Sequence, residues 1–125
     1  RKIAEAGSCV IVGRAAGFVL RDFDNAVNVF IHAPEAYRAA QVVIAYGSFA
    51  KQYSLRKTHS VLRGGTEAQA HEDISRADSV RAGYYAKISG EKWGEAKHYD
   101  LCLDSSIGAE KAARVIAEYA KGNGM

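Results

Sequence analysis

Two arginine-bearing patterns are the parts of the sequence with the clearest chemical use. The first is Asp78-x-x-Arg81-x-x-Tyr84-Tyr85, with Arg76 just before it. Residues three and four positions apart share a helix face, so this pattern gathers cations, a carboxylate and aromatic rings on about two turns. The alternative is a solvent-exposed face on which Asp78 simply pairs with Arg81.

The second pattern is Gly13-Arg14, which directly follows the apolar run Cys9 to Val12. Arginine offers a planar, permanently charged fork that matches a phosphate in two places. The alternative is an ordinary surface or ion-paired arginine. Both patterns therefore suit a phosphate-bearing ligand, provided that the fold presents them.

Three apolar runs indicate the strands that would position these residues: Cys9 to Val12, Val27 to His32 and Tyr99 to Leu103. Apolar runs without alternation are typical of strands that are covered on both faces, as in parallel sheets. Ligands of such sheets usually bind beyond the carboxyl ends of the strands. Arg14 is expected at that edge.

Helices are predicted over residues 1–6, 36–46, 66–88 and 109–121. Pro34 suits the start of the second helix, Gly47 is expected to end it, and Ser105 or Ser106 is available to cap the last one. Residues 48–65 are expected to form a connection. Strands separated by helices predict right-handed crossovers and a parallel α/β sheet.

The charge of the chain is concentrated in one region. The 125 residues carry a formal charge of +3, and residues 51–92 hold eight Lys+Arg against five Asp+Glu. Within them, residues 51–63 contain no acid, which suits a partner with phosphates or carboxylates. With Phe49 and Tyr53 this stretch could instead touch a nucleic acid, but no recognised nucleic-acid motif accompanies it, so we consider that partner unlikely.

The cysteines and the hydropathy pattern indicate a cytoplasmic protein. Cys9 and Cys102 both lie in apolar runs, so we expect two reduced core residues. No run approaches the ~18 apolar residues of a membrane span, and the start of the chain does not resemble a signal peptide. His98-x-x-x-Cys102 has no second ligand pair at zinc spacing, so no metal site is predicted.

Five motifs in series resemble the cytidylate kinase-like family, relatives of bacterial cytidylate kinase among the P-loop nucleoside monophosphate kinases. They are CVIVGR (9–14), NVFIHAP (28–34), DSVRAGYY (78–85), GEKWG (90–94) and YDLCLDSS (99–106). The resemblance implies phosphoryl transfer from ATP to CMP or dCMP with Mg²⁺, in which the protein positions groups and stabilises charge. It also implies a three-layer αβα fold around a parallel sheet of P-loop NTPase type.

The resemblance assigns roles to individual residues. Gly13 and Arg14 match the family's Gly-Arg that holds the monophosphate. Asp78 and Arg81 match the Asp-x-x-Arg of the mobile lid, where the arginine stabilises the transferring phosphoryl group and the aspartate orients sugar or arginine. Arg76 is expected to assist.

Four further residues follow from the same comparison. Arg38, on the helix after Pro34, is a lid-proximal candidate for substrate binding. Tyr84, Tyr85 and Trp93 could stack on a base, but such residues are more often part of the packing.

The chain also departs from the family pattern. Ala15 stands where bacterial cytidylate kinases have Asp, and no G-x-x-x-x-G-K-[ST] phosphate loop occurs anywhere. That loop and the first strand normally precede the matched part, in a sheet of order 2-3-1-4-5. The chain therefore predicts one partial domain with strands three, four and five, a core of residues 1–46 and 93–125, and a lid-like region of residues 47–92.

An incomplete sheet leaves backbone groups unpaired, at about 1 to 3 kcal/mol each if they are dry. Another chain, direct pairing of strands three and four, or a longer protein of which this is a fragment would each solve the problem. We favour the fragment or a rearranged dimer, and expect the chain alone to be inactive. The alternative is a non-catalytic module that binds a nucleotide or a protein and acts as an oligomer.

Overall fold

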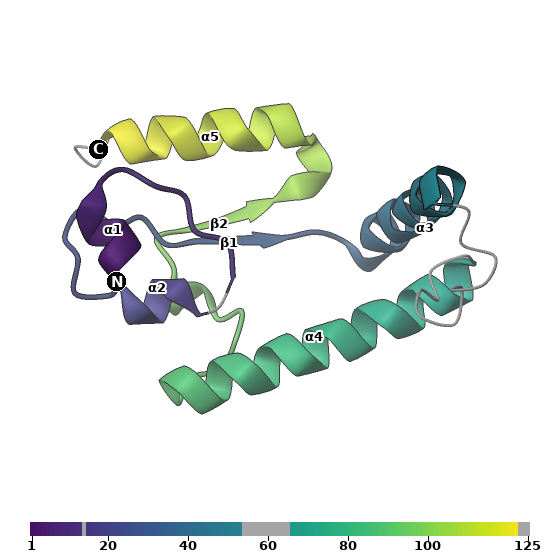
Figure 1. Cartoon of the computed structure of the whole chain (residues 1–125), viewed down its shortest axis with the longest axis horizontal. Helices are drawn as coiled ribbons and strands as arrows, with labels where there is room; N and C mark the ends of the chain where they lie inside the picture. Colours follow the sequence, from purple (N-terminus) through teal and green to yellow (C-terminus); the bar gives the residue numbers. More distant parts are fainter. Residues whose placement is uncertain (14, 54–65, 123–125) are drawn as a thin grey trace. The chain divides into compact units, whose positions relative to one another are not determined.

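The structure is a computed structural model. It describes residues 1–13, 15–53 and 66–122, with the backbone alone described for residues 46–53. The contacts divide the chain into two compact units, Arg1–His32 with Arg81–Met125, and Ala33–Val80. Figure 1 shows the elements of both units, and each unit is described by itself below.

The first unit contains a small parallel sheet. β1 (Val29–His32) pairs with β2 (Leu101–Asp104), with Val29 opposite Leu101 and His32 opposite Asp104. β1 falls within the second predicted run and β2 overlaps the third, ending one residue beyond it, which confirms a mixed α/β fold. The three-layer arrangement and the numbering of the strands stay predictions, because two strands pair among the described residues.

The first predicted strand, Cys9 to Val12, is wrong for this structure. These residues form no strand in the part of the chain that the structure describes, and Val10 and Val12 are 92% and 88% exposed. A β-prone segment becomes a strand only when a neighbouring strand pairs with its backbone. The predicted core positions of Cys9 and Cys102 are also wrong, since both thiols are free and exposed.

Short helices flank the sheet in the same unit. α1 (Lys2–Ala6) ends before Gly7 as predicted, and α2 (Ala16–Val19) follows the turn at Gly13. The 3₁₀ helix η2 (Ala96–His98) precedes β2. Asn28 links the start of β1 to the segment that precedes β2. Its backbone N–H donates to Asp100 Oδ2 at 2.7 Å, and its side chain donates to the His98 carbonyl at 2.9 Å.

The last helix, α5 (Ala109–Gly122), matches the predicted residues 109–121 and packs against β2. Its start differs from the prediction. Ser105 begins the 3₁₀ helix η3 (Ser105–Ile107), which Asp104 caps by accepting the Ser106 N–H at 2.8 Å. Gly108 instead precedes α5, and its carbonyl accepts the Ala112 N–H at 3.0 Å.

The second unit is built on α3 (Glu35–Tyr53) and the first part of α4 (Glu67–Ser89). α4 confirms the predicted helix over residues 66–88, whereas α3 runs through Gly47, so the stop predicted there is wrong. One glycine costs a helix only about 1 kcal/mol, which good helix formers on both sides can offset. Small side chains let the helices approach closely: Ala39, Ala70 and Ile74 are buried, with Val42 and Val43 packed against them.

Candidate functional site

An arginine and an aspartate from the predicted site meet in the second unit. Arg38 Nη1 donates to Asp78 Oδ2 at 2.8 Å, and Arg38 Nη2 donates to Asp78 Oδ1 at 2.7 Å. Their side chains are 31% and 27% exposed, so the pair is partly shielded from water. The hydrogen bond to Asp78 raises the pKa of Arg38, which is charged at all ordinary pH values.

Local sequence explains how α3 delivers Arg38 to this position. Pro34 precedes the helix, and its carbonyl accepts the Arg38 N–H at 3.1 Å, so Arg38 lies in the first turn. Asp78 lies on α4, 40 residues from Arg38 in the sequence, and no local sequence pattern links the two. The bidentate geometry fixes the plane of the guanidinium as well as its distance.

A second ion pair joins the same two helices. His71 Nδ1 lies 2.9 Å from Glu35 Oε1, and His71 Nε2 lies 3.8 Å from Glu67 Oε1. The hydrogen bond with Glu35 raises the pKa of His71. The pair therefore links the first turn of α3 to α4 most strongly when His71 is protonated.

The other candidate arginines differ in their surroundings. Arg76 Nη2 contacts Asp73 Oδ1 at 3.2 Å and Glu72 Oε1 at 3.7 Å, both on its own helix. Arg81 follows Asp78 by three residues on α4 and is exposed. Arg14 lies outside the described residues, as does most of the basic stretch 51–63, so neither prediction meets a structural observation.

Gly13 and Ala15 both have a left-handed backbone conformation. Gly13 has φ 73°, Ala15 has φ 52°, and the Ala16 N–H donates to the Gly13 carbonyl at 3.2 Å. A left-handed conformation at a residue other than glycine costs about 1 kcal/mol or more. Such strain is frequent at ligand sites, although it does not identify a ligand.

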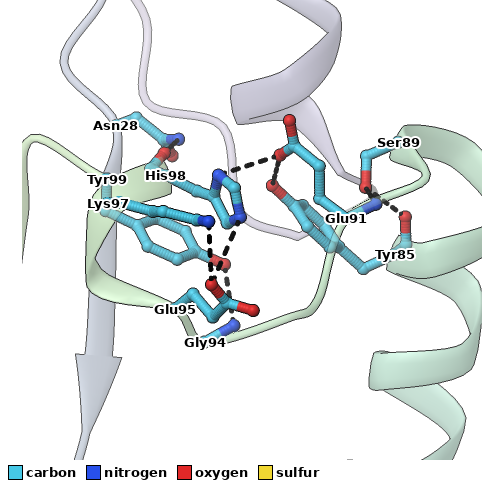
Figure 2. A network of polar contacts seen from close by, with 9 residues as sticks. All are labelled: Asn28, Tyr85, Ser89, Glu91, Gly94, Glu95, Lys97, His98 and Tyr99. Carbon is cyan, nitrogen blue, oxygen red and sulfur yellow. Dashed lines mark hydrogen bonds and ion pairs between the residues drawn. The ribbon is translucent and has the colours of Figure 1, made fainter.

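A polar network that the sequence did not reveal lies where α4 ends (Figure 2). Tyr85 is 7% exposed and its hydroxyl donates to Glu91 Oε2 at 3.3 Å, while His98 Nδ1 lies 3.1 Å from the same oxygen. Burial raises the pKa of Tyr85. Glu91 belongs to the GEKWG motif, but no sequence pattern identifies Tyr85 or His98 as its partner.

Aromatic packing surrounds this network. Trp93 meets Phe30 edge to face with ring centroids 5.3 Å apart, and Tyr99 lies 4.9 Å from the same ring. Tyr85 is buried, whereas Tyr84 is 44% exposed. Tyr85 and Trp93 therefore both take part in the packing of this unit.

The chain is similar to known proteins both in sequence and in fold. A model of the cytidylate kinase-like family matches residues 1–107. The chain belongs to the cytidylate kinase-like family. No curated protein matches it.

One solved structure similar to this family member is the crystal structure of an uncharacterized protein from Eubacterium ventriosum. The two chains have a TM-score of 0.73 and 23% sequence identity, and the match covers 95% of this chain. The likeness supports the fold alone at this identity. The present chain spans 57% of the length of that structure.

The cytidylate kinase-like family implies ATP and Mg²⁺, and the residues can be tested against both. Among residues 1–13, 15–53 and 66–122, no group of three His, Cys, Asp or Glu side chains could hold a metal ion. Mg²⁺ at a phosphate site commonly takes only one or two carboxylates beside the phosphates and waters, so such a site need not contain a cluster of this kind. The sequence lacks the G-x-x-x-x-G-K-[ST] loop that cradles ATP phosphates. No helix in the described part is long and apolar enough to cross a membrane.

Proposed function

We propose that this chain takes part in phosphoryl transfer from ATP to a cytidine monophosphate, CMP or dCMP, and supplies arginines that bind the phosphates. The bidentate Arg38–Asp78 pair is the observation that carries the proposal, because two residues assigned separately to the site meet at 2.7 and 2.8 Å. Family membership supplies the reaction class.

The proposed chemistry is positioning and charge stabilisation. Asp78 orients the Arg38 fork, so that less rotamer entropy is lost when a phosphate approaches. Arg81 carries a permanent charge on α4, the helix that also bears Asp78, and would stabilise negative charge on the transferring phosphoryl group. Arg14, with Gly13, would hold the phosphate of the acceptor, and Arg76 would assist the lid.

The chain by itself is expected to bind nucleotide without turning it over. It contains no phosphate-cradling loop, and such a loop is part of the charge stabilisation in P-loop enzymes. We therefore expect no CMP-dependent formation of ADP by the 125-residue chain. Turnover by the verified chain would show that the loop is not essential.

Calorimetric titration with CMP tests the role of Arg38. Arg38→Ala should weaken CMP binding about tenfold, because it removes a charged hydrogen-bond donor. Arg114→Ala is the matched control, since Arg114 is an exposed arginine on α5 that pairs with Glu110. Circular dichroism should show both variants folded. Equal CMP affinity in a folded Arg38→Ala variant would refute the proposed site.

A non-catalytic module that acts as an oligomer is the second candidate. The 92% and 88% exposure of Val10 and Val12 favours it, because apolar side chains at this exposure gain from burial against another chain. Sedimentation of a stable oligomer that binds CMP without turnover would favour this candidate over the enzyme.

A further inference from the structure

The end of α4 is joined to η2, the 3₁₀ helix before β2, by three side chains, Tyr85, Glu91 and His98, which we call the bracket. Glu91 Oε2 accepts from the Tyr85 hydroxyl at 3.3 Å and lies 3.1 Å from His98 Nδ1. All three residues belong to the same compact unit as Arg81. Figure 2 shows Glu91 between the tyrosine on the helix and the histidine that precedes β2.

We infer that the bracket positions Arg81: it fixes the rotation of α4 about its own axis and therefore the place of the Arg81 guanidinium. This inference rests on the role given to Arg81 in the proposed function. It assigns Tyr85, Glu91 and His98 as positioning residues that act through Arg81.

Tyr85 is suited to fix this rotation. It follows Arg81 by four residues, so the two side chains lie on neighbouring turns of the same side of the helix. Among residues 81–89, all of which the structure describes, Tyr85 is the buried side chain, and the neighbouring Ala82, Gly83 and Ala86 are small. Tyr85 is therefore the buried anchor of this end of α4.

The required precision is high for a phosphate-binding arginine. The end of a side chain lies about 6 Å from the helix axis, so a rotation of about 10° moves it by roughly 1 Å. A displacement of about 1 Å can cost on the order of a hundredfold in rate when a charged group must meet a reacting phosphate. A tyrosine that is buried and hydrogen-bonded one turn away opposes such a rotation.

The rest of the network makes the bracket rigid. The Ser89 hydroxyl donates to the Tyr85 carbonyl at 2.7 Å, and the Glu91 N–H donates to Ser89 Oγ at 3.0 Å, which holds the turn at Gly90. At the other end, the His98 carbonyl accepts from the Asn28 side chain at 2.9 Å. The connection thus runs from Asn28, just before β1, to α4 through polar contacts.

Other charged groups also face the bracket. Glu95 Oε2 lies 4.0 Å from His98 Nε2 and 3.4 Å from Lys97 Nζ. His98 is well shielded, with a side chain 16% exposed, while Glu91 is 38% exposed. Because several charged groups surround His98, the variants at Glu91 are chosen to change the hydrogen-bond geometry of the bracket and not only its net charge.

The experiment measures binding of CDP and cytidine by calorimetry, together with the NMR signal of the Arg81 Nε–H group. Tyr85→Phe removes one oxygen atom, and Glu91→Ala removes the acceptor. Both should weaken CDP binding about tenfold, leave cytidine binding within about twofold, and have no further effect when Arg81→Ala is present. Both should also shift the Arg81 signal.

Matched variants provide the controls. Glu91→Gln keeps an oxygen that accepts from the Tyr85 hydroxyl, so it should retain CDP affinity within about twofold. Tyr119→Phe and Glu110→Ala make the same chemical changes on α5 and should leave CDP binding and the Arg81 signal unchanged. If Glu91→Ala does not fold, Tyr85→Phe carries the same comparison.

Several results would overturn the inference. An equal loss of cytidine binding, or an equal loss of CDP binding in the Arg81→Ala background, would show a general effect on the fold. An unchanged Arg81 signal in folded Tyr85→Phe would show that the bracket does not place the arginine. Wild-type CDP affinity in Arg81→Ala would refute only the proposed role of Arg81 in binding phosphate. The NMR signal of Arg81 would still test whether the bracket places the arginine.

Discussion

Arg38 illustrates what one side chain contributes to the candidate site. From the resemblance it was a lid-proximal candidate for substrate binding, on the helix after Pro34. The structure gives it two hydrogen bonds to Asp78 on another helix. Arg76 shows the opposite outcome, since its contacts with Asp73 and Glu72 are of the local kind that spacing predicts.

His71 should make the stability of the α3–α4 unit depend on pH. Its pKa is raised in the folded state by Glu35, so the stabilisation is fully present below the unfolded pKa of about 6.5 and is lost as pH rises through the folded value. Urea unfolding between about pH 5.5 and 8.5 should therefore show the largest difference between wild type and His71→Gln at the acid end.

Glu35→Gln supplies the control for this prediction. It removes the carboxylate that raises the pKa of His71, so most of the pH dependence of the difference should disappear. A His71→Gln effect that grows toward alkaline pH would contradict the assignment, because it would require a lowered pKa.

At the scale of elements, the sequence predicted helices better than their ends. The helix over residues 66–88 and the last helix were confirmed, because periodicity and propensity act within one segment. The end predicted at Gly47 and the cap predicted at Ser105 or Ser106 failed. Both depend on a few tenths to about 1 kcal/mol, which neighbouring residues easily change.

Two glycine substitutions test the packing of the short and long helices. A Cβ on Gly17 in α2 would lie 2.5 Å from Asn28 Cγ, and that side chain is held by its bond to the His98 carbonyl. Gly17→Ala should therefore lower the free energy of unfolding by about 1 to 3 kcal/mol.

Gly83→Ala is the matched change in α4, where a Cβ would meet nothing within 4 Å. It should raise the free energy of unfolding by about 0.5 to 1 kcal/mol through the lost backbone entropy of glycine. Chemical denaturation measures both variants. A stabilising Gly17→Ala would show that Asn28 is not held where the structure places it.

At the scale of the whole molecule, the motifs identified the family but not the state of the sheet. Residues 1–107 match the cytidylate kinase-like family, and the chain spans 57% of a structure with a similar fold. The described residues pair two strands, while the apolar segment of residues 9–12 stays exposed. Whether that segment is buried in solution can be measured.

Substitutions of the exposed Val10 and Val12, compared with a substitution of the packed Phe30, provide the measurement. Val10→Ser and Val12→Ser should each change the free energy of unfolding by less than about 0.5 kcal/mol, as at other surface sites. Phe30→Ala should cost about 2 to 3 kcal/mol, because its ring packs against Trp93 and Tyr99. A cost of that size at Val10 or Val12 would show that the segment is buried as a strand.

The sequence by itself determined the positions of the main helices, two of the three predicted strands and the family. These properties depend on residue types and spacings within short segments. The tertiary structure decided that Arg38 is the bidentate partner of Asp78 and that Glu91 bridges Tyr85 and His98. It also decided that residues 9–12 pair with no strand among the residues that the structure describes. Each of these depends on which distant segments meet, as the 40 residues between Arg38 and Asp78 illustrate, and local spacing carries no record of such pairing.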